Sequence, residues 1–315
     1  MKNLILKFLF LVATIKYPKV RKDYRYFIRE NYYCRLLQLK FLIKDYIFKK
    51  EYKIIEFQGE FDQELRYVIP FAYWHYLNGT LKKTISCKNT KDFYFFCKDH
   101  EERHEKRFWE LSYTNTQMPN MTHSISFDYS KWVMVPFKQY YKNDIFKYSK
   151  PTLIIANKYN IEWDNAPLNF IDLKTLDQII FKFKHKYQII YNRPLSTQIV
   201  SDNSETLDLK EHQWLREQHP EVLLMDDLYR DNKNLVNNFN HLQLLVYANC
   251  DRFISAHGGT AAFASYFGGI NIVLSKKGIE HELNEFSTIF PMLSGSKILH
   301  AKEDSQILNY LQEYY

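Results

Sequence analysis

Glycine and proline are scarce in this chain, with 8 and 9 among its 315 residues. Turn-rich all-β folds need these residues at many tight connections, so their scarcity argues against an all-β architecture. Cysteines are also few, and they show neither metal-ligand spacing nor the density of a disulfide scaffold: Cys34, Cys87, Cys97 and Cys250. We therefore expect reduced thiols in a cytoplasmic protein.

The sequence has no apolar run long enough to cross a membrane. Its most apolar stretch, within residues 1–22, covers about a dozen positions and is interrupted by Lys7, whereas a spanning helix needs roughly 20 residues. It also lacks the small-residue cleavage site of a signal peptide. We expect a helix packed on the protein. The alternative is a peripheral helix whose cations face lipid headgroups: Lys2, Lys7, Lys16, Lys19, Arg21 and Lys22.

The composition is that of a globular protein, with 46% hydrophobic and 17% aromatic residues. The formal net charge of +7 comes mostly from scattered lysines. Such a charge suits a protein that handles anionic nucleotides or lies near anionic lipid. Because the cations and aromatic residues are not clustered, a surface that binds single-stranded nucleic acid by stacking is disfavoured. We expect no nucleic-acid partner.

The length and the element pattern predict two α/β domains. We expect a helical lead-in at residues 1–50, one Rossmann-like domain at 51–150 and a second at 151–315. In the last of these, expected strands at 152–157, 187–191, 222–225, 252–256 and 270–274 alternate with expected helices at 173–184, 209–218, 238–248 and 305–315. This alternation predicts a parallel sheet with right-handed crossovers and flanking helices.

The first half is less regular. We expect its first strand at 52–57, a helix at 64–77, and short strands at 84–86 and 93–96. The charged stretch 99–109 is predicted to be helical, and residues 112–131 a loop. A strand that ends in glycine and acidic residues before a helix has the geometry in which α/β enzymes place catalytic side chains.

The turn after the expected strand 252–256 is the main candidate for ligand binding. It reads His257, Gly258, Gly259, Thr260, and a helix is expected to follow. Unpaired N–H groups and the positive end of a helix dipole favour an anion such as phosphate there. Ligands of open parallel sheets bind beyond the carboxyl ends of the strands. The other residues predicted to belong to this site stand at such ends: Lys158, Asn192, Arg193 and Lys276.

Each of these residues has a structural alternative. Lys158 and Lys276 are also explained as solvated surface lysines, and Arg193 as a member of an ion pair. His257 is also explained as a helix cap, and the glycine pair as a means of close packing between helix and strand. The turn matches neither the dinucleotide-binding GxGxxG pattern nor a Walker loop.

Candidate catalytic residues follow the first expected strand. Glu60 and Asp62 are candidate general bases, because a carboxylate in a partly desolvated cleft can accept a proton from a sugar hydroxyl. His75 lies on the same expected helix. The alternative is that acidic residues simply favour the first turn of a helix. The pair Asp226 and Asp227 lacks the DxD pattern of metal-dependent sugar transferases, so helix capping is the better explanation and no metal is expected.

The order of three motifs resembles a known family. The segment Tyr191-Asn192-Arg193-Pro194, the helical stretch 238–249 and the segment 253–259 are similar to the donor domain of inverting GT-B glycosyltransferases of the plant xylosyltransferase and protein O-linked N-acetylglucosaminyltransferase type. The resemblance implies two Rossmann-like domains facing a cleft, an acceptor-side domain at 51–150 and a nucleotide-sugar donor-binding domain at 151–315. It also implies no metal or other cofactor, and it places Arg193 and His257 near the donor. The chain departs from the family's pattern at 259–260 and at 262–263.

These observations together predict a glycosyltransferase. It would move a sugar from a nucleotide-sugar donor to a glycan or polysaccharide acceptor by a single in-line displacement. The alternatives are a sugar-nucleotide epimerase of the same architecture and a non-catalytic protein that binds carbohydrate or nucleotide. The protein is expected in the cytoplasm, with peripheral association at the membrane as a further expectation.

Overall fold

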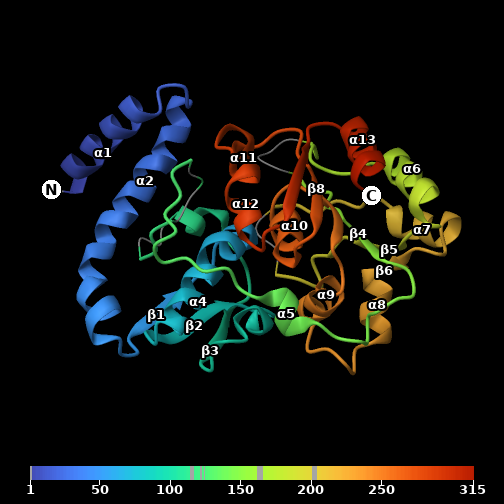
Figure 1. Cartoon of the computed structure of the whole chain (residues 1–315), viewed down its shortest axis with the longest axis horizontal. Helices are drawn as coiled ribbons and strands as arrows, with labels where there is room; N and C mark the ends of the chain where they lie inside the picture. The colour runs from blue at the N-terminus through green and yellow to red at the C-terminus, as the bar shows by residue number, and fades with distance from the viewer. Residues whose placement is uncertain (1, 114–116, 121–122, 124, 162–165, 201–203) are drawn as a thin grey trace. The chain divides into compact units, whose positions relative to one another are not determined.

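The structure is a computed structural model that describes residues 2–113, 117–120, 123, 125–161, 166–200 and 204–315. The chain divides into two compact units. Unit 1 comprises Met1–Val135 and Gly278–Ile289, and unit 2 comprises Pro136–Lys277 and Phe290–Tyr315. Each unit contains a parallel sheet with helices (Figure 1). The prediction of an α/β fold with parallel sheets and flanking helices is confirmed.

Unit 1 has a three-stranded parallel sheet in the order β1-β2-β3. Its elements in chain order are α1 Lys2–Lys16, α2 Lys22–Gln38, η1 Leu39–Phe41, η2 Lys44–Phe48, β1 Lys53–Glu56, α3 Phe61–Gln63, η3 Glu64–Val68, α4 Ile69–Leu77, β2 Leu81–Cys87, η4 Lys91–Tyr94, β3 His100–His104, η5 Trp109–Tyr113, α11 Ile279–Glu282 and η7 Glu285–Ser287. The expected helical lead-in, first strand and following helix are all present.

Two predicted elements of unit 1 are wrong. Residues 93–96 were expected as a strand, but Lys91–Tyr94 forms a 3₁₀ turn. The stretch 99–109 was expected as a helix, but it contains the edge strand β3. Charged side chains suit an edge strand that faces water. They are equally typical of a solvent-exposed helix, so their pattern alone does not separate the two. His100 of β3 stacks on the Tyr94 ring, with 4.6 Å between centroids, which ties the strand to the turn.

Unit 2 contains a six-stranded sheet and its helices. Its elements are α5 Phe137–Tyr141, β4 Thr152–Ala156, α6 Leu173–Phe183, β5 Gln188–Asn192, α7 Glu211–Gln218, β6 Leu223–Leu224, α8 Met225–Asp231, α9 Phe239–Ala248, β7 Arg252–Ala256, α10 Gly259–Ala264, η6 Ser265–Phe267, β8 Ile270–Leu274, α12 Ile289–Met292, whose first residue belongs to unit 1, β9 Lys297–Ala301 and α13 Asp304–Tyr314. All five strands expected here are present. The sequence did not predict β9 or the helices α5, α8 and α12.

The sheet of unit 2 is parallel throughout, in the order β6-β5-β4-β7-β8-β9. From β4 the chain proceeds outward to β5 and β6, then returns to the other side of β4 and proceeds through β7 and β8 to β9. The direction of winding therefore reverses between β4 and β7. In open α/β sheets this reversal is where ligands bind, at the carboxyl ends of the strands.

Both faces of this sheet are covered, which explains its nearly continuous apolar strands. On one face Leu153 and Ile155 of β4 belong to a core that includes residues of α6 and α13. On the other, Tyr247 of α9 stacks on Phe253 of β7, with ring centroids 5.6 Å apart. The Tyr315 hydroxyl donates to the Phe253 carbonyl at 2.8 Å, so the end of the chain is tied to the central strands.

The division between the units falls before α5, whereas the sequence placed a domain boundary near Lys150. Side chains of the segment 136–150 contact the rest of unit 2. The Phe137 ring lies 4.8 Å from the Tyr266 ring, and Lys138 Nζ donates to the Cys250 carbonyl at 3.0 Å. No helix among the described residues is long and apolar enough to cross a membrane.

Gly269 offers a test of how β7 and β8 are connected. Its φ is +67°, and a Cβ there would overlap the carbonyl of Asp251. That carbonyl accepts the N–H of Ile270 at 3.0 Å at the start of the β7–β8 pairing. We expect Gly269→Ala to lower the free energy of unfolding by more than about 2 kcal/mol, since left-handed strain alone costs roughly 1–2 kcal/mol.

The matched control is Gly295→Ala. Gly295 has a φ of +79°, but nothing lies within 4 Å of its added Cβ. In this variant the free energy of unfolding, measured with urea, should fall only by the cost of the left-handed conformation, about 1 kcal/mol. Equal losses in the two variants would contradict the importance of the contact with Asp251.

Candidate functional site

The candidate donor site lies at the carboxyl edge of the unit 2 sheet, where the winding reverses. Ala156 of β4 pairs with Ser255 of β7, and Ala256 of β7 pairs with Leu274 of β8. The residues that follow these strands therefore lie next to one another at the carboxyl edge of the sheet. In this way the register brings together three of the predicted segments: Asn157 and Lys158, His257 and Gly258, and Ser275 and Lys276.

Lys158 and Gly258 meet at the reversal itself. A Cβ built on Gly258 would lie 3.5 Å from Lys158 Nζ, so the ammonium group stands next to the backbone of the turn. Gly258 has a φ of +92°, a conformation that L side chains rarely adopt. Glycine is therefore required by the backbone of the turn, and the cation stands at van der Waals distance from the position of a Cβ there.

His257 is held in a fixed orientation beside this turn. The imidazole is buried, and its Nδ1 shares a hydrogen bond with Ser275 Oγ at 2.5 Å. The backbone N–H of His257 donates to the Leu274 carbonyl at 3.0 Å. Thr260 Oγ1 donates back to the Ala256 carbonyl at 2.5 Å, and Gly259 begins α10, which has only six residues. An anion bound at this turn would therefore interact mainly with its backbone N–H groups, because α10 is too short to have a large dipole.

Arg193 and Asn192 are engaged by protein groups. The Arg193 guanidinium is buried in an ion pair with Glu211 at the start of α7, and its Nη1 lies 3.3 Å from the Leu207 carbonyl. This is the structural alternative considered for Arg193. Asn192 Nδ2 donates to Gln243 Oε1 at 2.8 Å and to the Tyr247 hydroxyl at 2.7 Å. Its amide therefore joins β5 to α9.

Lys276 is also paired, since its Nζ lies 2.6 Å from Asp304 Oδ2. The loop that carries Lys276 is fixed by Asn169, which the sequence reasoning missed. Asn169 Oδ1 accepts the N–H of Lys276 at 2.8 Å, and its Nδ2 donates to the Lys277 carbonyl at 2.9 Å. No local pattern indicates this role, because Asn169 is more than a hundred residues away in the chain.

A buried asparagine also positions Lys158. Asn157 Oδ1 accepts the N–H groups of Lys158 at 3.0 Å and of Ile171 at 2.9 Å. Its Nδ2 donates to the Ile171 carbonyl at 2.9 Å. The end of β4 is thereby joined to the segment that enters α6, so the backbone of Lys158 is well defined.

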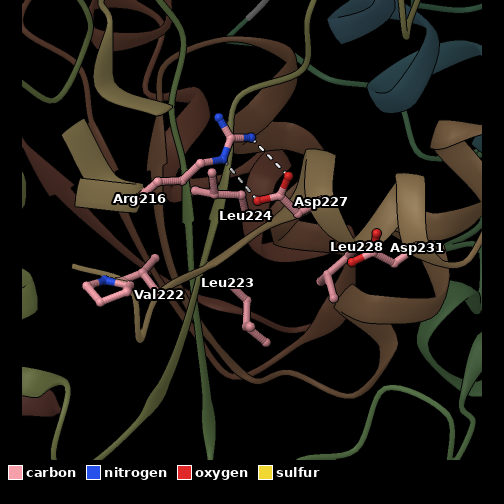
Figure 2. Close-up of a pocket in the computed structure, with 8 residues that line it drawn as sticks. Arg216, Val222, Leu223, Leu224, Asp227, Leu228 and Asp231 are labelled. Atoms are coloured by element: carbon pink, nitrogen blue, oxygen red, sulfur yellow. Dashed lines mark hydrogen bonds and ion pairs between the residues drawn. The ribbon is translucent and has the colours of Figure 1, made fainter. Parts of the chain in front are cut away.

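A separate pocket in unit 2 lies beside the edge strand β6 (Figure 2). It is lined by residues of α7, β6 and α8, and none of the predicted donor residues contributes to it. At its rim Arg216 donates to Asp227 at 2.9 Å and lowers the pKa of that carboxyl group. Asp226 accepts a hydrogen bond from Gln198 Nε2 at 2.5 Å. Protein donors thus engage both carboxylates of the Asp226–Asp227 pair.

In unit 1, Glu60 and Asp62 occupy different surroundings. The Glu60 backbone N–H donates to Ser112 Oγ at 2.9 Å. Both carboxylate oxygens of Asp62 accept hydrogen bonds from Arg66, with 3.0 Å between Nε and Oδ1. Arg66 is fully buried and also pairs with Glu285. Burial alone would lower the pKa of Arg66, but the carboxylates raise it well above its usual value.

The loop that carries Glu60 is anchored by residues that the sequence reasoning missed. Arg107 Nη1 donates to the Gly59 carbonyl at 3.0 Å, and its Nη2 donates to Glu64 Oε2 at 2.6 Å. Glu64 is fully buried and also accepts the Tyr94 hydroxyl at 2.7 Å. A buried carboxylate needs such donors, so this cluster fixes the backbone before α3.

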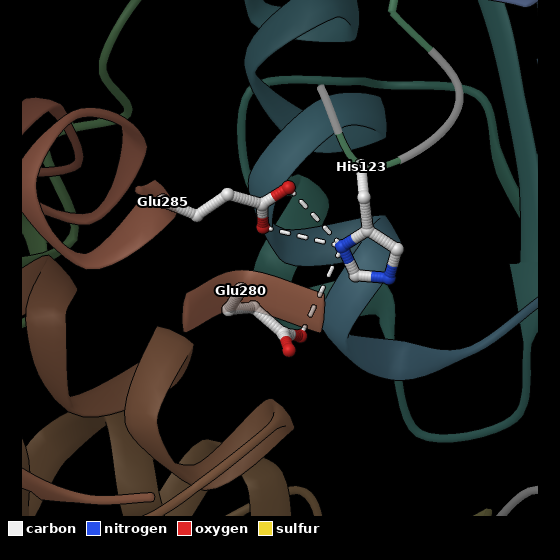
Figure 3. A group of neighbouring side chains, drawn as sticks. All are labelled: His123, Glu280 and Glu285. Carbon is white, nitrogen blue, oxygen red and sulfur yellow. Dashed lines mark hydrogen bonds and ion pairs between the residues drawn. The ribbon is translucent and has the colours of Figure 1, made fainter. Parts of the chain in front are cut away.

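His123, Glu280 and Glu285 form a buried cluster next to Arg66 (Figure 3). His123 Nδ1 lies 3.2 Å from both oxygens of Glu285 and 3.9 Å from Glu280 Oε1. Burial alone would lower the pKa of His123, but the two glutamates raise it to about 9. At neutral pH the imidazole therefore carries a proton. No local pattern indicates this cluster, because His123 and the two glutamates are far apart in the chain.

By ligand type this cluster resembles a cation site, since its candidate ligand atoms lie within 4.8 Å of one another. Its charges favour a proton over a metal ion. A metal needs a neutral imidazole, and Arg66 already neutralises Glu285. The Gln63 amide faces His123 Nε2 at 3.4 Å, and its Oε1 has no hydrogen-bond partner among the described residues. Rotating that amide by half a turn would place an acceptor opposite the protonated Nε2.

His75, the third predicted catalytic residue, is enclosed. Its side chain is fully buried on α4, and its Nδ1 lies 2.7 Å from Thr80 Oγ1. Burial lowers the pKa of His75 to about 2, and the cations of Lys53 and Lys131 add to this effect. His75 is therefore neutral and presents no surface to a substrate, which favours a structural role.

Comparisons with known proteins are sparse. No family model matches the chain, and no curated protein matches it in sequence. Among solved structures it is similar to the E. coli ADP-heptose LPS heptosyltransferase II, with a TM-score of 0.47 and 8% sequence identity. The similarity covers 84% of this chain and 98% of that chain.

The pKa of His123 predicts a pH dependence of stability. Because the pKa rises from 6.5 to about 9 on folding, the stabilisation is fully present below pH 6.5 and is lost as pH rises through about 9. The shift corresponds to roughly 3 kcal/mol in the free energy of unfolding. Urea unfolding of the wild type should show this decline, and His123→Gln should flatten it. An unchanged slope in the variant would contradict the assignment.

His75 supplies an internal contrast, because its pKa moves in the other direction. With a pKa of 6.5 unfolded and about 2 folded, its neutral form is favoured by folding. Stability should therefore fall as pH drops below 6.5, and His123→Gln should leave that acid decline intact.

Proposed function

We propose that this protein is a glycosyltransferase that uses a nucleotide-sugar donor. The observation that carries the proposal is the position of Lys158 beside the Gly258 turn, where the winding of a doubly wound sheet reverses. A cation and the backbone N–H groups of a glycine turn at that place suit a diphosphate. His257, oriented by Ser275, adds a hydrogen-bonding group next to it.

The proposed reaction is a single in-line displacement that inverts the anomeric carbon. An acceptor hydroxyl loses its proton to a carboxylate, and its oxygen forms a bond to the anomeric carbon. The bond from that carbon to the diphosphate oxygen breaks, and the nucleoside diphosphate leaves with the electron pair. Lys158 and the turn at 257–260 stabilise the negative charge that develops on the leaving group.

Glu60 is the better of the two candidate bases. Both oxygens of Asp62 are engaged by Arg66, so Asp62 serves to balance a buried cation. Glu60 precedes α3 on a loop that Arg107 and Ser112 fix in place. A carboxylate carried by a loop whose backbone is fixed, directly after a strand, is suited to accept a proton from a bound hydroxyl.

The acceptor class and the absence of a metal requirement are part of the same proposal. We propose a glycan or polysaccharide as acceptor, because a basic N-terminal segment with an apolar helix suits work at a membrane face. The diphosphate charge is assigned to Lys158 and the backbone of the turn, which removes the need for a divalent cation. The described carboxylates near Arg66 and Arg216 are already paired.

Substitution of Lys158 tests the donor site. Lys158→Ala should weaken binding of a nucleoside diphosphate about tenfold or more, since a charge-assisted hydrogen bond contributes roughly 1.5–3 kcal/mol. Isothermal titration with a panel of nucleoside diphosphates, with EDTA present, would measure this. The matched control is Lys182→Ala, an exposed lysine on α6. If no nucleoside diphosphate binds the wild type, the glycosyltransferase proposal fails.

Paired amide substitutions test the base. Glu60→Gln should lower kcat by about 10²–10⁴-fold and leave the affinity for the donor unchanged. Asp62→Asn should instead lower the free energy of unfolding, because Arg66 would lose one of its charge partners. Donor consumption and urea unfolding would be measured for both variants. Wild-type turnover in Glu60→Gln would refute its assignment as the base.

A further inference from the structure

Helix α1 presents a row of exposed apolar side chains. Leu4 is 74% exposed, Phe8 63%, Leu11 55% and Ile15 72%. Their spacing of four, three and four residues places them on one face of the helix. Leu9 is buried on the other side, where α1 packs along α2. The helix is therefore apolar both toward the protein and toward the solvent.

The charged side chains of this segment all have one sign. Residues 2–22 contain no acidic side chain. Lys7 and Lys16 fall on opposite sides of the exposed row, as 3.6 residues per turn requires. Arg21 pairs with Glu282 at 3.6 Å, but the lysines of this segment remain as a cationic fringe: Lys2, Lys7, Lys16, Lys19 and Lys22.

A second patch of the same composition follows α2. Residues 39–48 expose the apolar side chains Leu39, Leu42, Ile43, Tyr46, Ile47 and Phe48. Lysines at 40, 44, 49 and 50 accompany them. The acid of this segment, Asp45, is buried and accepts hydrogen bonds from Lys131 and Tyr52. The exposed charge of this patch is therefore also entirely positive.

We propose that α1 and residues 39–48 form a surface that binds a membrane containing anionic lipid. The apolar row enters the boundary between headgroups and acyl chains, and the lysine ammonium groups contact anionic headgroups. A second copy of the chain suits this surface poorly, because a two-fold interface would place its lysines against one another. The inference depends on unit 1 alone and does not rest on the proposed catalytic activity.

Vesicle flotation of the full chain tests the proposal. The protein should float with vesicles of phosphatidylcholine mixed with phosphatidylglycerol, much less with phosphatidylcholine alone, and less as salt concentration rises. No binding to the anionic vesicles would overturn the proposal. Binding that ignores lipid charge and salt would also overturn it.

Variants of the exposed row locate the contact. The double substitution Phe8→Asp with Ile15→Asp should weaken vesicle binding more than tenfold. The matched control is Phe181→Asp, which alters a side chain 72% exposed on α6 in unit 2 and should bind normally. Lys7→Ala and Lys16→Ala should each weaken binding about fivefold. Normal binding by the Phe8 and Ile15 variant would overturn the assignment of this face.

Two further measurements cover misfolding and self-association. Phe8→Trp preserves an apolar side chain, and its fluorescence should shift to the blue on anionic vesicles, whereas Phe181→Trp should show no added shift. Light scattering of the lipid-free wild type should report a species that the Phe8 and Ile15 substitutions do not change. A dimer that those substitutions dissociate would identify the row as a contact between copies and would overturn the membrane proposal.

Discussion

The reversal of winding between β4 and β7 is the constraint on which unit 2 depends. The connection after β4 leads to β5, and the connection after β7 leads to β8 on the opposite side. The two connections therefore leave a space between them at the carboxyl edge of the sheet. Lys158 and Gly258 stand at those two ends, although they are far apart in sequence. Topology alone brings the cation to the turn.

Buried amides make this edge rigid. Asn157 joins the end of β4 to the segment before α6, and Asn169 holds the loop after β8. Asn192 joins β5 to α9. Each amide lies where a buried backbone or side-chain group would otherwise lack a hydrogen-bond partner. An unpaired buried group lowers the free energy of unfolding by roughly 1–3 kcal/mol. The same contacts that satisfy the interior therefore define the backbone on which a ligand would bind.

Periodicity and composition predicted the strands of unit 2, because strands buried on both faces read as short apolar runs such as β7 and β8. They failed for β3, whose charged side chains suit a solvated edge. In the candidate site, the pattern placed Lys158 and the turn at Gly258 at the same edge. It did not reveal Asn169 or the cluster of His123 with Glu285, because their partners lie more than a hundred residues away. Side chains that act through tertiary contacts leave no local signal.

Because lysines are frequent throughout the chain, composition alone does not show which cations stabilise the folded structure. Arg193 and Arg66 are surrounded by the carboxylates of their own chain, so their charges stabilise the structure. The lysines of residues 2–22 have no acidic neighbour in that segment and flank apolar side chains that face the solvent. A cation that is paired with a carboxylate of its own chain stabilises the fold. A group of lysines without acidic neighbours instead attracts anionic groups of other molecules. The location of the countercharge therefore separates structural cations from those available for binding.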